Sequence, residues 1–312
     1  MHIVLAEPLG VTENALRDLS APLIAAGHEF THYYDKAADD VLLAERLQDA
    51  DIALIANRPL PQSVLKKCEK LRYIDVAFTG YDHVAMDYCR EKNILVSNAA
   101  GYSDQTVAEI TLGFALSLLR KLPACNLAVR HGGTSAGLRG REIAGHTVGV
   151  IGLGRIGKRV AQLFSAFGAS VIACDPAGSG DYPMVSLCEL LERSDIVTLH
   201  APANESTRKM LGAKQFARMK ASAIFINCAR GALVDSKALA DALNSGLIAG
   251  AAVDVFDVEP PLPMDEPLLQ AKNCILAPHV AYLSDESMLR RAQIVFDNLT
   301  AYLAGHPQNL CR

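Results

Sequence analysis

The chain has 312 residues, a length that predicts two domains because a domain usually contains about 100–200 residues. Hydrophobic residues make up 50% of the chain and charged residues 21%, which excludes a disordered polypeptide. The formal net charge is −4, so no basic surplus indicates a nucleic acid or an anionic membrane as a partner.

The eight cysteines are scattered, and none stands in a Cys-x-x-Cys or zinc-type spacing, so we expect no metal site. This usage is typical of reduced, mostly buried thiols in a cytosolic protein. No basic segment precedes the apolar run at 3–6, so we expect a first strand there and no signal peptide. The longest charge-free helical stretch, 110–119, is shorter than the about 20 residues of a membrane span, so we expect a soluble, cytoplasmic protein.

Strands and helices alternate over the first hundred residues. Runs rich in β-forming residues stand at 3–5, 29–32, 52–55, 73–76 and 94–96. Helical patterns lie between them at 12–26, 41–49, 62–70 and 84–91. This alternation predicts parallel βαβ units.

A helix at 106–120, apolar almost all round and therefore expected to be buried, leads to a second series that starts at Gly145. This series has six predicted strands: 147–151, 171–174, 196–199, 223–227, 250–254 and 274–277. Six is the number of strands in a full doubly wound dinucleotide-binding fold. Ser186 and Glu189 have the spacing of a helix capping box.

An amphipathic helix at 285–304 ends the chain, and we expect it to pack on the N-terminal domain. The predicted fold is α/β, with two doubly wound parallel-sheet domains. Residues 1–100 and 285–312 would form one discontinuous domain, and residues 101–284 would form the dinucleotide-binding domain.

A glycine-rich turn follows the first strand of the second series and opens a helix. Gly152, Gly154 and Gly157 form the pattern G-x-G-x-x-G, with Arg155 and Ile156 between the last two glycines. In such a turn the first glycine allows the tight turn, the second lets the backbone approach a pyrophosphate, and the third lets the helix pack on the sheet. The helix N-terminus offers free N–H groups to the anion. The alternative is a glycine-rich turn that binds nothing.

Asp175 ends the next predicted strand, about 20 residues after Gly152, where a carboxylate would accept hydrogen bonds from the adenosine ribose. It would repel a 2′-phosphate, and the following Pro176, Ala177 and Gly178 supply no cation to receive one. NAD is therefore favoured over NADP as the cofactor. The alternative for Asp175 alone is a turn-initiating aspartate before proline.

Three polar residues follow the last three predicted strands: Arg230, Glu259 and His279. Ligands of open α/β sheets bind beyond the carboxyl ends of the strands, so all three are expected near the glycine-rich turn. Singly, such an arginine is commonly a surface ion-pair partner and such a histidine a structural residue. Together, in chain order, they predict a catalytic constellation.

The chain resembles the NAD-dependent D-2-hydroxyacid dehydrogenases over its whole length. The matching stretches are GHTVGVIGLGRIG at 145–157, His200-Ala201-Pro202 with Thr207, INCARGALVD at 226–235, AAVDVFDVEP at 251–260 and APHVAY at 277–282. The resemblance implies a flavodoxin-like substrate domain and a Rossmann NAD-binding domain. It implies an oxidoreductase that interconverts a 2-oxo acid and the D-2-hydroxy acid. A chain that stops at Arg312 would lack the regulatory C-terminal extension of many relatives acting on phosphoglycerate.

The resemblance also assigns catalytic roles. Arg230 would pair with the substrate carboxylate and polarise the keto oxygen, which suits a planar, always-charged guanidinium. His279 would be the general acid and base, and Glu259 would orient it and favour its charged form.

Further positions match binding residues of the family. The backbone around Phe78, Thr79 and Gly80 would hold the substrate carboxylate, and Asp254 would receive the nicotinamide carboxamide. The other expected cofactor contacts are Thr106, Arg155, Ile156, Pro202, Thr207, Cys228 and Ala229. Arg58 would contact a second acidic group of the substrate or be a solvated loop residue.

The family resemblance also bears on assembly and on alternative functions. Residues 122–146 are long for a connection, and in this family such a segment embraces a second subunit, so we expect a homodimer. The alternative is a mobile surface loop. Alternative functions are a non-catalytic NAD-sensing protein of the same fold and a formate dehydrogenase-like enzyme, although the latter carries an amide where this chain has Glu259.

Overall fold

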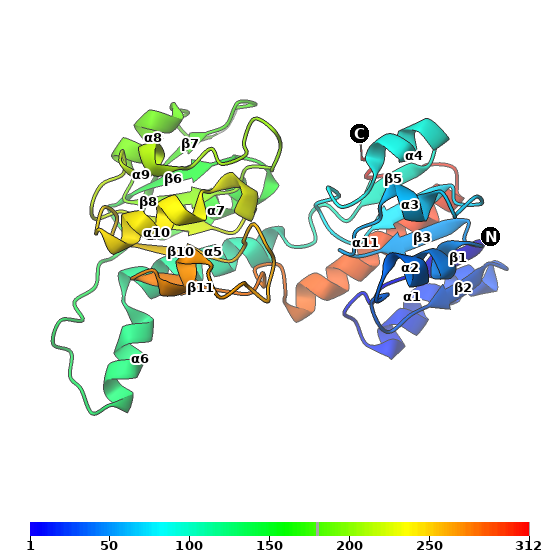
Figure 1. Ribbon diagram of the computed structural model, residues 1–312, viewed down its shortest axis with the longest axis horizontal. Helices are drawn as coiled ribbons and strands as arrows, with labels where there is room; N and C mark the ends of the chain where they lie inside the picture. The colour runs from blue at the N-terminus through cyan, green and yellow to red at the C-terminus, as the bar shows by residue number, and fades with distance from the viewer. Residues whose placement is uncertain (179–180, 312) are drawn as a thin grey trace. The chain divides into compact units, whose positions relative to one another are not determined.

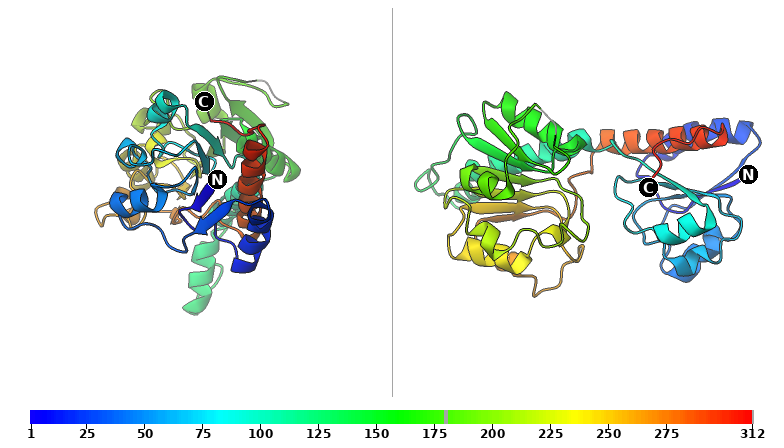
Figure 2. Two further views of the ribbon diagram at one scale, coloured as in Figure 1. Left: turned by 90° about the vertical axis from the view of Figure 1, so that its right-hand side faces the viewer. Right: turned by 90° about the horizontal axis from the view of Figure 1, so that it is seen from above.

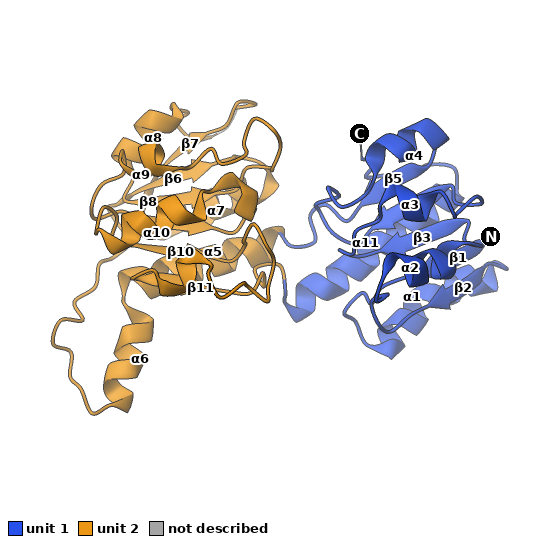
Figure 3. Ribbon diagram, viewed as in Figure 1, with its two compact units in different colours: residues 1–103, 283–312 blue, residues 104–282 orange. Residues whose placement is uncertain are grey.

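The computed structural model describes residues 1–178 and 181–311, which fall into two compact units (Figure 3). Unit 1 comprises 1–103 and 283–312, and unit 2 comprises 104–282. Each unit is a parallel sheet with helices on its faces, which confirms the predicted fold class.

The sheet of unit 1 has the strand order β2-β1-β3-β4-β5, and every pair in it is parallel. Its strands are β1 (His2–Leu5), β2 (Glu29–His32), β3 (Ile52–Ile55), β4 (Tyr73–Val76) and β5 (Leu95–Asn98). Its N-terminal helices are α1 (Glu13–Ala25), α2 (Asp40–Leu47), α3 (Gln62–Leu65) and α4 (Met86–Lys92). The prediction of a helix at 62–70 is wrong in length. After Leu65 the chain continues as turns closed by hydrogen bonds between residues three positions apart, and these turns bury Cys68 and Leu71.

The two faces of this sheet are buried by different helices. Side chains of α2, α3 and α4 pack with Val4, Ile55 and Val76 in one core cluster. The last helix, α11 (Asp285–Leu303), packs against β4 and α1, and its Tyr302 stacks on Tyr73 with ring centroids 4.1 Å apart. The amphipathic C-terminal helix therefore lies in unit 1, as Figure 2 shows.

The sheet of unit 2 has six parallel strands in the order β11-β10-β9-β8-β6-β7 (Figure 1). They are β6 (Thr147–Ile151), β7 (Ser170–Cys174), β8 (Ile196–Leu199), β9 (Ile224–Asn227), β10 (Gly250–Val253) and β11 (Cys274–Leu276). The order reverses beside β6, whose neighbours are β7 and β8. This is the topological switch point at which a doubly wound sheet binds its ligand.

Helices cover both faces of this second sheet. On one face α5 (Asp104–Leu119) and α7 (Arg155–Ala166) pack with Val148, Val150 and Ile226. On the other, α8 (Leu187–Arg193), α9 (Ala213–Phe216) and α10 (Ser236–Asn244) pack with alternate strand residues such as Val197 and Phe225. This alternation follows from the two-residue period of a strand.

Helix α5 differs from expectation, because it is buried on one face only. Val107, Thr111 and Phe114 are buried, whereas Ile110 and Leu116 remain partly exposed. Among the described residues no single helix is long and apolar enough to cross a membrane. Within this described part of the chain, the bent pair of α5 and α6 (Leu122–Arg130) alone reaches that length and composition, and its two helices are bent by 56°.

Helix α6 was not predicted, and it occupies the first part of the long 122–146 segment. None of its residues is buried, and Leu122, Leu127 and Val129 expose apolar side chains. The capping box expected at α8 is half confirmed. The Ser186 hydroxyl accepts the Glu189 N–H, but the Glu189 carboxylate accepts a hydrogen bond from Arg193 one turn further on.

Candidate active site

The glycine-rich turn lies between β6 and α7, at the switch point of the second sheet. Gly152 has φ +89°, and a Cβ there would lie 2.6 Å from the carbonyl carbon of His200. At Gly157 a Cβ would lie 2.0 Å from the Gly152 carbonyl oxygen. Both glycines are therefore required by backbone packing, the first by a left-handed turn as well.

Gly154 differs from these two glycines, because a Cβ built on it would meet nothing within 4 Å. Its missing side chain is not explained by the chain's own packing. It stands at the N-cap of α7, where amide N–H groups lack helical partners. An open, side-chain-free surface at a helix N-terminus fits the pyrophosphate of a dinucleotide.

Two charged groups flank this turn. The Asp175 carboxylate accepts hydrogen bonds from the backbone N–H of Leu153 at 2.6 Å and of Ala177 at 2.8 Å, which fixes it beside the turn. The Arg155 guanidinium is largely exposed and pairs with Asp104 at 2.8 Å. Ile156 packs partly into the α5–α7 core.

The segment after β8 forms a compact turn beyond Gly152. The Thr207 hydroxyl donates to the Pro202 carbonyl at 2.8 Å and accepts the Asn204 N–H at 2.9 Å. His200 bonds the Thr198 hydroxyl at 2.8 Å, and desolvation lowers its pKa to about 3. His200 is therefore a neutral structural residue.

Arg230 stands in a turn that buried Asn227 organises. The Asn227 side chain accepts the Ala229 N–H and donates to the Arg230 carbonyl, both at 3.0 Å. At Gly231 a Cβ would lie 2.0 Å from the carbonyl carbon of Phe256, so only glycine lets this turn meet the segment after β10. The turn that carries Arg230 is thereby packed against the segment that leads to Glu259.

Cys228 and Thr106 lie on the α5 side of the same sheet. Burial raises the pKa of the Cys228 thiol to about 12, so it is a small neutral side chain and not a nucleophile. Thr106 stands in the first turn of α5, which packs closely on α7.

The side chains of Glu259 and His279 contact each other, with 3.0 Å between Oε2 of Glu259 and Nδ1 of His279. Both side chains are partly exposed. The Tyr282 ring meets the imidazole edge-on, with centroids 5.6 Å apart. The pair leaves Nε2 as the second ring nitrogen, the position from which a proton can be exchanged with a bound oxygen.

Asp254 is completely buried, although the resemblance assigns it a contact with the cofactor. Its two carboxylate oxygens accept the N–H groups of Val280 and Ala281, each at 2.9 Å. Burial raises its pKa, and the two N–H donors oppose that shift. Its hydrogen bonds thus go to the turn that carries His279.

The expected substrate loop, Phe78 to Gly80, belongs to unit 1. The Arg291 guanidinium of α11 lies over the Phe78 ring at 4.8 Å, and the Tyr102 ring meets Phe78 edge-on. The Thr79 carbonyl accepts a hydrogen bond from the Asn98 side chain. These contacts hold the loop at the carboxyl ends of β4 and β5.

Arg58 is neither solvated nor available as a free cation. Its side chain is 18% exposed and its guanidinium pairs with Asp40 at 3.0 Å. Its backbone N–H bonds the buried Glu7 carboxylate. The sequence does not predict this arrangement, because Asp40 lies in another element.

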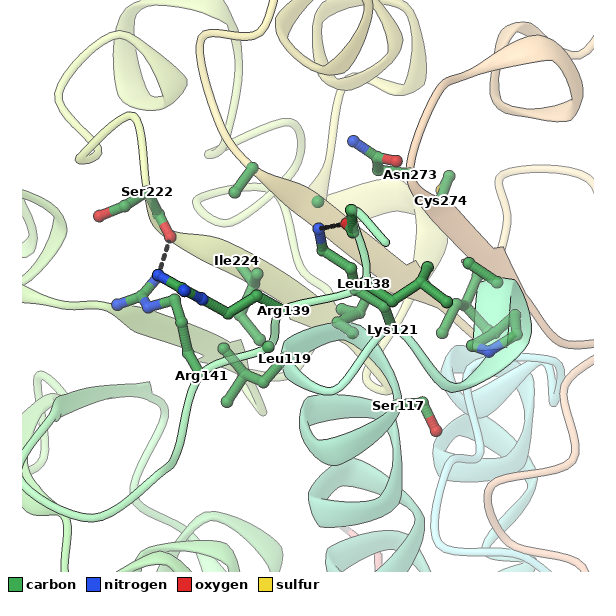
Figure 4. A pocket seen from close by; sticks show the side chains of 18 residues that line it. Ser117, Leu119, Lys121, Leu138, Arg139, Arg141, Ser222, Ile224, Asn273 and Cys274 are labelled. Carbon is green, nitrogen blue, oxygen red and sulfur yellow. Dashed lines mark hydrogen bonds between the residues drawn. The ribbon is translucent and has the colours of Figure 1, made fainter. Parts of the chain in front are cut away.

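A cavity of about 510 Å3 lies at the opposite, amino edge of the second sheet (Figure 4). Ile224, Gly250 and Cys274, the first residues of β9, β10 and β11, line it together with Lys121 and Arg139 near α6. Figure 4 also shows Arg141 bonded to the Ser222 carbonyl in this cavity. The cavity is therefore separate from the candidate site at the carboxyl edge.

Within unit 2 the structure gathers the turn at Gly152, Asp175, Arg230, Glu259 and His279 at the carboxyl ends of the strands. Two features of this site were not predicted from the sequence: the side-chain hydrogen bonds of Asn227 and those of Asp254. Their only signal in the sequence is a short polar side chain at the end of an apolar strand.

Comparisons with known proteins identify the family to which the chain belongs. Residues 112–281 match the family model described as "D-isomer specific 2-hydroxyacid dehydrogenase, NAD binding domain". The chain is 39% identical over 272 residues to D-3-phosphoglycerate dehydrogenase of Methanocaldococcus jannaschii, which covers 84% of this chain and 52% of that protein. The chain thus spans about half the length of that relative.

Other relatives match over most of both chains. Glycerate dehydrogenase of Methylorubrum extorquens is 38% identical over 293 residues, which is 91% of this chain and 92% of that protein. Glyoxylate reductase of Korarchaeum cryptofilum is 36% identical over 282 residues, 86% of this chain and 85% of the other.

Solved structures repeat the architecture. An acyclic imino acid reductase in complex with NADPH and D-Arg has a TM-score of 0.92 at 28% identity, with both chains fully covered. D-lactate dehydrogenase from Aquifex aeolicus, complexed with NAD and lactic acid, has a TM-score of 0.85 at 28% identity and covers 98% of this chain and 96% of its own. The chain belongs to the D-isomer-specific 2-hydroxyacid dehydrogenase family, and residues 112–281 carry that family's NAD-binding domain.

Proposed function

We propose that the protein reduces a small 2-oxo acid to the D-2-hydroxy acid with NADH and catalyses the reverse oxidation with NAD. The observation that carries this proposal is the 3.0 Å pair of Glu259 and His279 at the carboxyl edge of an NAD-binding sheet. A histidine oriented by a carboxylate can donate a proton at neutral pH and take it back in the reverse reaction.

NADH, when bound, would supply the hydride for the keto carbon. His279 gives a proton from its ring to the keto oxygen, while Glu259 holds the imidazole through Nδ1. Arg230 binds the substrate carboxylate and draws electron density from the keto oxygen, because its guanidinium can hold two oxygens at once.

We propose NAD as the preferred cofactor over NADP. The Asp175 carboxylate is fixed beside the glycine-rich turn and would repel a 2′-phosphate. The pyrophosphate would lie against Gly154 and the first amides of α7, with Thr106, Arg155, Ile156, Pro202, Thr207, Cys228 and Ala229 around the rest of the cofactor.

The proposed substrates are small 2-oxo acids without a second acidic group, such as glyoxylate and hydroxypyruvate. Relatives that match most of this chain are named glyoxylate reductase, glycerate dehydrogenase and hydroxypyruvate reductase. The charge of Arg58 is already offset by Asp40, so this arginine gives no support to a phosphorylated substrate.

We also propose a homodimer that forms through unit 2. Helix α6 exposes the apolar side chains of Leu127 and Val129. The cavity near this helix is lined by Lys121 and by apolar residues such as Leu138. A second copy of the same surface would cover both, as expected for a two-fold interface.

The experiment is a panel of 2-oxo acids offered to the purified protein with NADH, followed by loss of absorbance of the reduced cofactor. The panel contains glyoxylate, hydroxypyruvate, pyruvate, phenylpyruvate, a branched 2-oxo acid and a phosphorylated one. We expect turnover with the small members and much less with the phosphorylated acid. Tight NADH binding with no turnover on any member would instead indicate a non-catalytic NAD-binding protein.

A further inference from the structure

The sheet of unit 1 has a topological switch point of its own. In the order β2-β1-β3-β4-β5 the strand order changes direction between β1 and β3. A doubly wound sheet of this order binds its ligand at the carboxyl ends of the strands beside that point. The chain continues after β1 through Glu7 and after β3 through Asn57 and Arg58. Charged residues therefore stand at the end of this sheet where its topology places a ligand.

Glu7 fixes the segment that carries Arg58. It is completely buried, and one of its carboxylate oxygens accepts the Ala56 N–H at 2.9 Å. The backbone nitrogen of Arg58 lies 3.2 Å from both oxygens. The backbone of Arg58 is therefore tied to the end of β1, whatever its side chain binds.

The Arg58 side chain has hydrogen-bond donors that the protein does not use. Within residues 1–178 and 181–311 its guanidinium makes one hydrogen bond, from Nη2 to Oδ1 of Asp40 at 3.0 Å. In the same part of the chain the buried Nε has no hydrogen-bond partner. A guanidinium carries five N–H donors in a fork that fits the oxygens of a carboxylate or a phosphate. Arg58 can therefore bind an acidic group of a ligand, but only in competition with Asp40.

Asp40 supplies the charge that competes with a ligand. It is the first residue of α2, and its side chain is 52% exposed, so solvent reaches the pair. A carboxylate on this guanidinium takes the place of a ligand's acidic group and repels a second negative charge. Lys36 lies nearby, because its ammonium donates a hydrogen bond to the Asn57 side chain. Without the charge of Asp40, the cations Arg58 and Lys36 would remain at the end of β3.

A second arginine of unit 1 is paired with an aspartate but is much more fully occupied. Arg46 in α2 donates from Nη2 to both carboxylate oxygens of Asp35 at 3.0 Å, and from Nη1 to the carbonyls of Ala6 and Asp35. Its guanidinium also lies over the Tyr33 ring at 4.1 Å, and its side chain is 6% exposed. Loss of the charge of Asp35 would therefore not free Arg46 for a ligand.

We propose that Asp40 is a specificity-determining residue: its carboxylate occupies the guanidinium of Arg58 at the end of β3 and thereby excludes substrates that carry a second acidic group. The proposal rests on the proposed function, the reduction of small 2-oxo acids, and it names the pair of residues that sets this choice of substrate. The 2-oxo acid group is common to all these substrates, so the pair acts on the rest of the molecule.

The test compares hydroxypyruvate with two acids that carry a second acidic group: phosphohydroxypyruvate, which has a phosphate, and 2-oxoglutarate, which has a second carboxylate. The variant Asp40→Asn keeps the size of the side chain and removes its charge. We expect kcat/KM for at least one of the two acids, relative to that for hydroxypyruvate, to rise at least about 10-fold, the effect of one charge-assisted hydrogen bond gained. The acid that gains more shows whether Arg58 receives the phosphate or the carboxylate.

Two further variants separate this role from a general effect of charge. Asp35→Asn removes the same charge from the same unit but leaves Arg46 occupied, so the ratios should stay close to the wild-type values. Asp40→Asn combined with Arg58→Met also removes the cation, and the ratios should return to the wild-type values. Each ratio compares two substrates on one variant, so a partial loss of folded protein cancels. If Asp40→Asn does not fold, Asp40→Ser is assayed in its place.

A second readout needs no activity. Inorganic phosphate at constant ionic strength should raise the melting temperature of Asp40→Asn more than that of the wild type or of Asp35→Asn, because a ligand that binds only the folded protein stabilises it. Unchanged ratios, an equal rise in Asp35→Asn, or a rise that persists without Arg58 would overturn the proposal, as would a wild type that prefers phosphohydroxypyruvate. Inactivity of the wild type with every 2-oxo acid would instead refute the proposed function, and the phosphate result would then decide whether Asp40 blocks an acidic ligand.

Discussion

His279 occupies a left-handed turn and contacts Glu259 through Nδ1 and Tyr282 through its ring. Replacement of His279 by alanine should lower kcat at least about 100-fold for both reduction and oxidation, because the same proton is given in one direction and taken in the other. Steady-state assays in both directions measure this. His131→Ala, an exposed histidine on the segment after α6, is the control and should keep full activity. A variant His279→Ala with more than a tenth of wild-type activity would exclude His279 as the acid and base.

The contact of Glu259 with Nδ1 of His279 should be visible in the rates of both reactions. Glu259→Ala removes the carboxylate that holds the imidazole, so kcat should fall about 10- to 100-fold for reduction and for oxidation. Glu259→Gln keeps an oxygen that can accept a hydrogen bond from Nδ1, and it should retain more of the activity. Steady-state assays in both directions measure this, and equal rates for the wild type and Glu259→Ala would exclude a role for Glu259 in placing the ring.

Residue types at strand ends could be predicted from the sequence, whereas their hydrogen bonds could not. Arg230, Glu259 and His279 each follow an apolar strand, which is visible in one dimension. The bonds of Asp254 to residues 26 and 27 positions away depend on the register between strands. Arg58 illustrates the same limit, because its partner Asp40 lies in α2, another element.

At the scale of elements, the β6–α7 turn and the end of β7 should decide which dinucleotide is used. The double variant Asp175→Ala with Ala177→Arg removes the carboxylate and adds a cation that can receive a 2′-phosphate. The ratio of kcat/KM for NADPH to that for NADH should rise by at least about 10-fold. Ala177→Arg alone is the control and should shift the ratio less. A wild type that uses NADPH as well as NADH would contradict the role given to Asp175.

Strand positions were predicted well because each strand is a short apolar run between turn residues, and β2, β3, β4, β6 and β8 have the expected bounds. Helices were less predictable where tertiary contacts decide their length. α3 ends early because Cys68 and Leu71 turn inward, and α6 was missed because no buried face marks it in the sequence. Propensity and pattern alone do not specify either feature.

At the scale of the whole molecule, the burial of Asp75 predicts how the free energy of unfolding depends on pH. It lies in β4 with its side chain fully buried, and burial raises its pKa to about 8, although Asn298 donates a hydrogen bond to it. The folded state therefore holds this proton more tightly than the unfolded state, whose carboxyl has a pKa near 3.8. The contribution of Asp75 to stability is greatest below about pH 4 and is lost as the pH rises toward 8.

The variant Asp75→Asn should remove this dependence. Urea unfolding at several pH values measures the free energy of unfolding of both proteins. Between pH 4 and 8 this free energy should rise for the variant relative to the wild type, by at most about 1.4 kcal/mol for each unit of the pKa shift. Asp51→Asn in the same unit is a control with a partly exposed carboxylate. A constant difference between Asp75→Asn and wild type across this range would mean that Asp75 is not protonated in the folded state.

The assembly predicted from α6 is also a property of the whole molecule. Light scattering at micromolar concentration should give twice the mass of one chain. The variant Leu127→Asp with Val129→Asp places charges on the exposed apolar side of α6 and should dissociate the dimer. The control is Val41→Asp, which places a charge on an exposed apolar side chain of unit 1 and should leave the dimer intact. A wild type that stays at the mass of one chain would refute the proposed interface.

Hydride transfer to the keto carbon is tested most directly by a single turnover with NADH that carries deuterium at its transferable position. The protein in excess is mixed with labelled NADH and hydroxypyruvate, and the product is analysed for isotope and configuration. The account predicts D-glycerate with one deuterium on carbon 2, formed by the wild type and strongly slowed in His279→Ala. The experiment is run with each of the two forms of NADH that carry deuterium on one or the other face of the dihydronicotinamide C4. Formation of the L enantiomer, or of a product that lacks deuterium on carbon 2 with both forms, would contradict the account.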